Sequence, residues 1–269
     1  MIKRQLADTG VAISPLGLGT VKLGRNKGVK YPTDFEIPDD PAALDLLALA
    51  KELGINLIDT APAYGNSEER LGPLLQGQRH DWVICSKVGE EFDNISGDSS
   101  FNFTPEHVQF SVERSLQRLQ TDYIDMLLVH SDGNDIGIIQ QYGILDVLEE
   151  LKQAGKIRAT GMSTKTVDGG LLALEKSDCA MVTYNLNHRE EEAVLDYAAQ
   201  HNKGVLLKKA LASGHICQDQ SIDPIKASFD FIYSHPGVTS AIIGTINPQH
   251  LRSNVRAAEK AIKQQWLSQ

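Results

Sequence analysis

The chain has 269 residues, of which 26 are Lys or Arg and 35 are Asp or Glu, and its formal net charge at pH 7 is −9. This excess of negative charge argues against non-specific binding to nucleic acid or to anionic membrane surfaces, because both depend on clustered basic side chains. No apolar run approaches the roughly 18 residues that suggest a membrane-spanning helix, so we expect no membrane association.

The cysteines and the N-terminus bear on the cellular compartment. Cys85, Cys179 and Cys217 are an odd number of thiols, and no two have the spacing of a metal site or a redox motif. Residues 1–8 contain no apolar segment of the signal-peptide type. We therefore expect a cytoplasmic protein with reduced thiols and without a metal centre.

The first expected element is a hairpin, and strands alternating with helices follow it. Residues 3–14 hold Asp8, Thr9 and Gly10 between apolar residues, which predicts a short β-hairpin. The predicted strands are Leu16–Thr20, Ile55–Asp59, Trp82–Lys87, Ile124–His130, Ile157–Met162, Ala180–Tyr184, Gly204–Lys208 and Ser240–Gly244. The predicted helices include Pro41–Leu53, Pro105–Leu119, Ile144–Ala154, Glu190–His201, Pro224–Tyr233 and Pro248–Ala261.

This alternation predicts parallel strands joined by helical crossovers. Eight repeats in 269 residues give about 34 residues each, which is close to the size of one βα unit. We therefore expect an α/β fold in which residues 1–269 form a single domain. That domain would be a (β/α)8 TIM barrel whose bottom is closed by the N-terminal β-hairpin.

Turn chemistry predicts where helices begin and where long loops lie. Four capping side chains each precede a proline and predict a helix N-terminus, namely Asp40, Thr104, Asp223 and Asn247. Two long polar stretches, Val21–Asp39 and Lys87–Phe103, are expected to be loops on the catalytic face of the barrel. The segment 17–22 begins like a dinucleotide-binding fingerprint, but Lys22 replaces its last glycine, which argues against a Rossmann domain.

Four ionisable residues gather where the predicted strands end. Asp59, Lys87 and His130 end three neighbouring strands, and Tyr64 lies five residues after Asp59. Any one of these residues alone is more often structural than functional. Their joint occurrence at the end of the barrel where catalytic groups usually lie makes a reactive site the stronger hypothesis.

These residue types fit the protonation of a carbonyl oxygen. A tyrosine has an ordinary pKa near 10, and a neighbouring ammonium such as that of Lys87 would lower it. A carboxylate, Asp59, would hold the lysine charged, and a neutral His130 would orient the carbonyl by hydrogen bonding. No side chain supplies a hydride, so reduction of a carbonyl would require a nicotinamide cofactor.

The sequence also resembles a known family. The segment Asp59–Gly72 closely resembles the signature of the aldo-keto reductases, and Ile84–Val88, Asp122–His130 and Ile243–Asn254 resemble further segments of that family in order. The resemblance implies reversible NAD(P)H-dependent reduction of aldehydes or ketones to alcohols. In that reading Tyr64 is the proton donor, Lys87 and Asp59 tune it, and His130 orients the small-molecule substrate.

The resemblance also implies that NAD(P)H lies extended across the barrel mouth, with NADPH as the expected cofactor and NADH as the alternative. The implied cofactor-binding residues are Gly19, Thr20, Lys22, Asp59, Ser163, Lys208, Leu211, Ser213, Gly244, Thr245, His250 and Asn254. Three positions depart from the family pattern: Thr164 replaces an asparagine, Met181 a glutamine and Lys208 a stacking aromatic. Lys208 either faces the nicotinamide or points away from it. Gly244 and His250 stand where many members carry basic residues, which puts the NADPH preference in doubt.

Two other functions stay open at this stage. The barrel could be a cofactor-binding regulatory or interaction protein with little turnover. It could also be a lyase or isomerase that uses Lys87 to form a Schiff base, although Tyr64 and the cofactor-like C-terminal segment would then be unexplained. We expect a monomer whose partner is the carbonyl substrate.

Overall fold

The computed structural model describes residues 1–29, 31–212 and 223–267. Its strands are β1 Arg4–Leu6, β2 Val11–Ile13, β3 Leu16–Gly19, β4 Leu57–Asp59, β5 Val83–Val88, β6 Glu90–Phe92, β7 Ser99–Phe101, β8 Ile124–His130, β9 Ile157–Ser163, β10 Cys179–Thr183, β11 Gly204–Lys208 and β12 Ser240–Ile243. Its α-helices are α1 Val21–Gly24, α2 Asp40–Glu52, α3 Ser67–Leu74, α4 Pro105–Leu119, α5 Asp135–Tyr142, α6 Ile144–Gln153, α7 Val167–Lys176, α8 Glu192–Gln200, α9 Pro224–Ser234 and α10 Pro248–Leu267.

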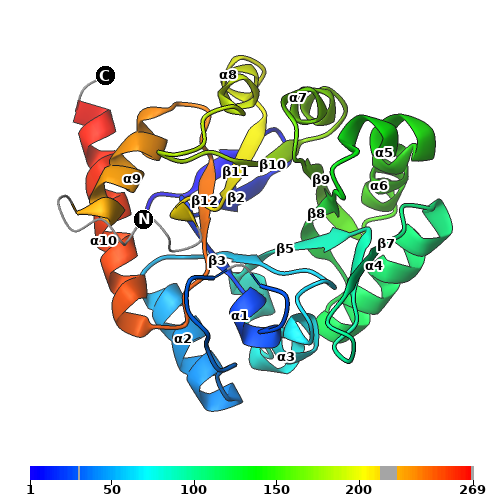
Figure 1. Ribbon diagram of the computed structural model, residues 1–269, viewed down its shortest axis with the longest axis horizontal. Helices are drawn as coiled ribbons and strands as arrows, with labels where there is room; N and C mark the ends of the chain where they lie inside the picture. Colours follow the sequence, from blue (N-terminus) through cyan, green and yellow to red (C-terminus); the bar gives the residue numbers. More distant parts are fainter. Residues whose placement is uncertain (30, 213–222, 268–269) are drawn as a thin grey trace.

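A closed parallel barrel forms the centre of the molecule. Its strand order is β10-β11-β12-β3-β4-β5-β8-β9, and β9 pairs back with β10 to close the ring. The helices from α2 to α10 follow one another around the outside in chain order, so that α10 comes to lie beside α2 (Figure 1). The predicted (β/α)8 barrel is therefore confirmed, and each predicted barrel strand is present within two residues of its expected bounds.

Three local predictions were wrong. The cap of α2 is Asp39 rather than Asp40, because the Asp39 carboxylate accepts the backbone N–H of Ala42. The stretch expected to be a loop after β3 begins with the short helix α1. The stretch expected to be a loop after β5 contains an antiparallel hairpin, β6–β7. The polar composition of both stretches hid these short elements, which fold back onto the barrel mouth and have little periodicity of their own.

The other caps lie where the sequence predicts them. The side chain of Thr104 accepts the N–H of His107, and Asp223 accepts from the first turn of α9. Asn247 accepts the N–H groups of Gln249 and His250 at the start of α10. These side chains satisfy backbone donors that a helix cannot bond within itself.

The N-terminal hairpin plugs the bottom of the barrel, as predicted. Strands β1 and β2 pair antiparallel, and Leu6, Val11 and Ile13 belong to the apolar cluster that fills the barrel interior. A Cβ at Gly204, which starts β11, would lie 2.2 Å from Cδ1 of Leu6. The hairpin therefore sits directly against the barrel floor.

Strand alternation decides which side chains face the barrel interior. Cys85, Leu128 and Leu206 lie in the interior cluster, whereas their chain neighbours Ile84 and Leu127 pack outward against the helices. Since successive side chains on a strand point to opposite faces, residues two positions further along also face inward. At the carboxyl ends of the strands this rule places one ring of residues, the mouth layer: Gly19, Asp59, Lys87, His130, Ser163, Thr183, Lys208 and Gly244.

The mouth layer differs chemically from the layers beneath it. The interior cluster below is entirely apolar, whereas six of the eight mouth-layer positions are polar or charged and the other two are glycine. Two thiols, those of Cys85 and Cys179, are free and buried in the lower layers, and burial raises the pKa of both. Cys217 lies outside the described residues. Within the described part of the chain, every helix is too short or too polar to cross a bilayer.

The plugging hairpin yields a stability prediction. Leu6→Ala should lower the free energy of unfolding by about 2–4 kcal/mol, because it removes a fully buried side chain and leaves a cavity at the barrel floor. Urea unfolding followed by circular dichroism measures this change. Ile2→Ala is the matched control, since the Ile2 side chain is 69% exposed, and it should change stability by less than about 0.5 kcal/mol. Equal effects of the two substitutions would contradict the plug.

Candidate active site

Asp59, Tyr64 and Lys87 meet through one ammonium group at the barrel mouth. Lys87 Nζ lies 2.5 Å from Asp59 Oδ1 and 2.9 Å from Tyr64 Oη. The Tyr64 hydroxyl lies 3.2 Å from Asp59 Oδ2. The three side chains therefore form a closed hydrogen-bonded triangle made by the end of β4, the loop after it and the end of β5.

The ammonium of Lys87 is completely engaged. Besides the two side chains it donates to the backbone carbonyl of Thr60 at 2.9 Å, so that all three of its N–H groups have an acceptor. Lys87 and Asp59 are both almost fully buried. Burial alone would lower the pKa of Lys87, but the charge and hydrogen bond of Asp59, together with the effects of Tyr64 and Cys85, outweigh it and raise the pKa above the ordinary value.

The pKa of Tyr64 moves in the direction opposite to the one expected from its lysine neighbour. Burial raises it and the charge of Asp59 raises it further, whereas Lys87 lowers it by its charge and its hydrogen bond. The two raising effects are larger, so the pKa of Tyr64 lies above its ordinary value and the phenol is protonated at neutral pH. Lys87 still has the expected effect, since a phenolate formed at this position would lie against its ammonium.

His130 stands edge-on to Tyr64. The ring centroids are 6.3 Å apart with an interplanar angle of 85°, and the His130 side chain is 20% exposed. Burial lowers the pKa of His130, and Lys87 and Lys208 add to this effect, while Glu90 opposes it. We take the imidazole as neutral because burial is the leading cause and two ammonium groups face it.

Glu90 is a site residue that the sequence did not reveal. One of its carboxylate oxygens lies 2.9 Å from Nδ1 of His130, although the contact lies off the direction of a ring N–H and is not an aligned hydrogen bond. Burial raises the pKa of Glu90, but His130, Ser99 and Arg25 together hold it at about 2. Glu90 therefore presents a charged carboxylate to the back of the imidazole.

A glycine turn places Glu90 there. Gly89 has φ of +105°, a conformation that favours glycine, and a Cβ at this position would lie 2.5 Å from the Phe103 ring. The chain thus bends directly after β5, and Glu90 at the start of β6 lies against His130. In the sequence, the only signal for this residue was the dipeptide Gly89-Glu90 directly after Val88. The position of Glu90 beside His130 cannot be recognised from it without the pairing of β6 with β7.

Several expected cofactor residues lie in the mouth layer. Ser163 is the register partner of His130, and its hydroxyl accepts a hydrogen bond from Lys208 at 3.0 Å. Lys208 therefore points inward, which decides between the two orientations left open by the sequence. Gly19 and Gly244 offer no side chains there, and a Cβ at Gly19 would already lie 3.0 Å from Ile242.

Other expected cofactor residues lie outside that layer. Thr20 is buried, and its hydroxyl donates to the carbonyl of Asp59 and accepts from Ser67, so it is committed within the protein. The ammonium of Lys22 lies 4.2 Å from the centroid of the Tyr31 ring, and burial lowers its pKa. Leu211 packs against the main core. Ser213 lies outside the described residues.

The three remaining expected residues belong to the region around the start of α10. Thr245 accepts the N–H of Asn247, and His250 is exposed in the first turn of the helix. Asn254, one turn further along, is buried, and its Oδ1 has no hydrogen-bond partner among the described residues. An unpartnered buried oxygen is costly, so this amide is a candidate ligand group.

The departures from the family pattern also have definite positions. Met181 lies in the apolar interior cluster below the mouth layer, where its side chain has no hydrogen-bond donor. The hydroxyl of Thr164 faces α7, since it lies 3.4 Å from where a Cβ of Gly170 would be. Thr183, which the sequence analysis did not single out, is the β10 member of the mouth layer.

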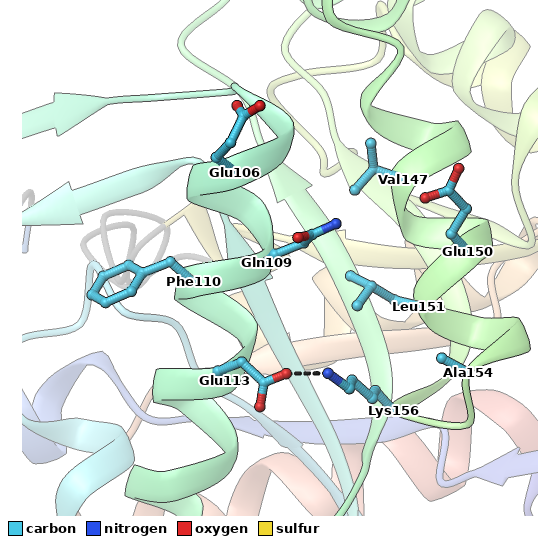
Figure 2. Close-up of a pocket in the computed structure, with 9 residues that line it drawn as sticks. All are labelled: Glu106, Gln109, Phe110, Glu113, Val147, Glu150, Leu151, Ala154 and Lys156. Atoms are coloured by element: carbon cyan, nitrogen blue, oxygen red, sulfur yellow. Dashed lines mark hydrogen bonds and ion pairs between the residues drawn. The ribbon is translucent and has the colours of Figure 1, made fainter.

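A surface pocket lies away from these residues. It has a volume of about 530 Å³ and lies between α4 and α6 on the outside of the barrel (Figure 2). The Glu113–Lys156 ion pair spans it, and none of the expected site residues lines it. The barrel mouth, and not this pocket, therefore holds the cluster of interacting ionisable groups.

Comparisons with known proteins agree on one family. The model of the Aldo/keto reductase family matches residues 15–216. The chain is 28% identical to the uncharacterised oxidoreductase YqkF of Bacillus subtilis, over 96% of this chain and 91% of the relative. It is 32% identical to an NADH-specific methylglyoxal reductase of Escherichia coli, over 81% of this chain and 71% of the relative.

A solved structure is more similar still. A Pseudomonas aeruginosa protein assigned provisionally to the aldo-keto reductases is 60% identical, with a TM-score of 0.87. The match covers 97% of this chain and 95% of that one. The likeness therefore extends over the barrel and the N-terminal hairpin together.

The Glu90–His130 contact yields a prediction. Glu90→Gln should lower the pKa of His130 further, because the substitution removes the nearby negative charge that opposes the effect of burial. NMR titration of the histidine ring resonances measures this pKa. The matched control is Glu91→Gln, since Glu91 pairs with Arg114 and His107 instead, and this variant should leave His130 unchanged. An unaltered His130 titration in Glu90→Gln would contradict the assignment.

Proposed function

Because this chain belongs to the aldo/keto reductase family, we propose that it reduces aldehydes or ketones to alcohols with a nicotinamide cofactor, with Tyr64 as the proton donor. The family consists of oxidoreductases that use NAD(P)H. The observation that carries the proposal is the triangle of Lys87, Tyr64 and Asp59 at the barrel mouth, with the His130 ring beside it.

The residues divide the work of protonating an alkoxide. Tyr64 gives its hydroxyl proton to the carbonyl oxygen as negative charge develops there, and the resulting phenolate lies against the Lys87 ammonium. Asp59 keeps Lys87 charged. Glu90 lies against Nδ1 of His130, so the Nε2–H of the ring donates a hydrogen bond to the same oxygen and orients the carbonyl. The bound nicotinamide supplies the hydride for the carbonyl carbon, and solvent returns a proton to Tyr64 after turnover.

The residues of the mouth and of α10 suit a nicotinamide dinucleotide. The buried oxygen of Asn254 needs a donor, which an adenine amino group would supply. Gly19 ends β3 and Gly244 directly follows β12, both without side chains, and Gly244 is exposed, although the Tyr31 hydroxyl would lie 3.2 Å from a Cβ there. Ser163 and Lys208 are the polar groups at the far side of the mouth, where the carboxamide of the nicotinamide would lie.

We propose NADPH as the cofactor, with NADH also accepted. The first turn of α10 has no acidic side chain to repel a ribose phosphate, and His250 is exposed there. It has no lysine or arginine either, so discrimination against NADH should be weak. The Escherichia coli relative is NADH-specific, which makes a direct comparison of the two cofactors necessary.

The other candidate functions find less support. A Schiff-base mechanism needs a neutral amine, whereas the three N–H groups of Lys87 are all bonded and its pKa is raised. A purely regulatory role leaves the whole triangle without a purpose. Cofactor binding without turnover on a broad panel of aldehydes and ketones would favour that role over ours.

The central prediction concerns Tyr64. Tyr64→Phe should lower kcat for carbonyl reduction by roughly 10²–10⁴-fold, because the substitution removes the proton donor. The dissociation constant of the reduced cofactor should change by less than about twofold. Reduced-cofactor absorbance and fluorescence measure the two quantities. Tyr197→Phe is the control, since Tyr197 stacks on His201 at the outer helix α8. Parental turnover in Tyr64→Phe would overturn the mechanism.

A second prediction tests the cofactor. His250→Asp should raise KM for NADPH by roughly two- to fivefold, because an exposed carboxylate would repel the ribose phosphate. KM for NADH, which lacks that phosphate, should stay unchanged and serves as the control within the same variant. Steady-state kinetics with both cofactors measures the effect. Parallel changes in the two KM values would contradict the placement of the phosphate at His250.

A further inference from the structure

Lys208 is a second ammonium in the mouth layer, and the catalytic triangle does not use it. Its side chain follows Leu206 of the interior cluster by two positions on β11, so it points into the barrel. Its Nζ donates to the hydroxyl of Ser163 at 3.0 Å and to the backbone carbonyl of Thr164 at 2.5 Å. Both acceptors are neutral.

The charge of Lys208 is therefore much less compensated than that of Lys87. Among the described residues, no carboxylate oxygen lies within ion-pair distance of it, whereas Lys87 lies directly on Asp59. Glu191 and Asp135 are the two carboxylates that raise the pKa of Lys208 most, and both accept hydrogen bonds from other groups. Glu191 accepts the backbone N–H of Thr183. Asp135 accepts the Ser131 hydroxyl and the backbone N–H groups of Lys165 and Thr166.

The other charged groups facing Lys208 are cations or neutral. Lys209 and Lys165 are ammonium groups that repel its charge, and His130 has its own pKa lowered by Lys208. Burial is the main cause that lowers the pKa of Lys208, to about 8. The side chain therefore changes charge within an experimentally accessible range.

The chemistry of hydride transfer places the nicotinamide within reach of this charge. The donor carbon must approach the carbonyl carbon to about 3–3.5 Å, and Tyr64 and His130 fix that carbonyl. Ser163 is the register partner of His130, and Lys208 bonds to Ser163. A ring held over this part of the mouth thus lies about one side chain away from the Lys208 ammonium.

We propose that Lys208 makes the barrel distinguish the two redox states of its cofactor, so that it binds the neutral reduced nicotinamide more tightly than the positively charged oxidised ring. The proposal rests on the proposed function, since it requires a nicotinamide at the mouth. The repulsion acts on the oxidised ring alone, because the rest of the dinucleotide is the same in both states. It speeds release of the oxidised cofactor after turnover.

The first test needs no variant. The ratio of the dissociation constants of NADP⁺ and NADPH should fall about tenfold between pH 6.5 and pH 9.5, because Lys208 loses its proton in this range. The charges of the phosphates affect both forms equally and cancel in the ratio. Isothermal titration calorimetry for NADP⁺ and cofactor fluorescence for NADPH give the two constants. A ratio that does not change with pH would overturn the proposal.

Three variants separate charge from structure. Lys208→Met should lower the ratio about tenfold at pH 6.5 and make it independent of pH, since an apolar side chain of similar length replaces the ammonium. Lys208→Arg should keep the high ratio at both pH values, because the guanidinium stays charged. Lys209→Met is the matched control: it removes the same charge from the exposed next residue and should keep the high ratio at pH 6.5, with the fall in the ratio moved to higher pH because Lys209 no longer lowers the pKa of Lys208.

The outcomes also separate this proposal from the one it rests on. If both cofactor forms bind and carbonyls are reduced, but Lys208→Met leaves the ratio unchanged, only the role of Lys208 is wrong. If neither form binds to the parent protein, the proposed function and the role of Lys208 both fail. Circular dichroism checks that the variants fold; should Lys208→Met unfold, the parental pH series together with Lys208→Arg decides the matter.

Discussion

The buried ion pair of Asp59 and Lys87 is the interaction on which the rest of the site depends. Removing two charges from water is costly, and the cost is offset only when every donor and acceptor finds a partner. Here the carboxylate, the carbonyl of Thr60 and the Tyr64 hydroxyl accept all three protons of the ammonium. The pair therefore fixes the position of the phenol, and the phenol in turn faces the imidazole of His130.

Much of this arrangement follows from local sequence patterns. The strands of the barrel are apolar runs bounded by polar turns, and such runs are expected when a sheet is covered on both faces. Asp59, Lys87 and His130 could be placed together before any coordinates because each ends such a run. Parallel strands bring their carboxyl ends to one rim of the barrel, so the positions of these residues in the sequence were enough to predict that their side chains lie close together.

The parts that the sequence left undetermined depend on contacts between distant segments. Glu90 reaches His130 because the chain bends at Gly89 and β6 pairs with β7, and neither short strand has a pattern that identifies it. The inward direction of the Lys208 side chain could be assigned only once Leu206, two positions earlier on β11, was known to lie in the barrel interior. The direction of the pKa shift of Tyr64 could not be predicted without its burial and its positions relative to Asp59 and Lys87, since these two charged neighbours act in opposite directions.

The hairpin at the barrel floor has a consequence for the electric field inside the molecule. Because Leu6, Val11 and Ile13 seal that end with hydrocarbon, the charges of the opposite rim have water on one side only. The apolar floor screens these charges only weakly, so their electrostatic field is strongest toward the open side of the barrel, where solvent and ligands lie. The hairpin lies far from the reacting atoms, yet it directs the field of the rim charges toward a ligand that enters the open mouth.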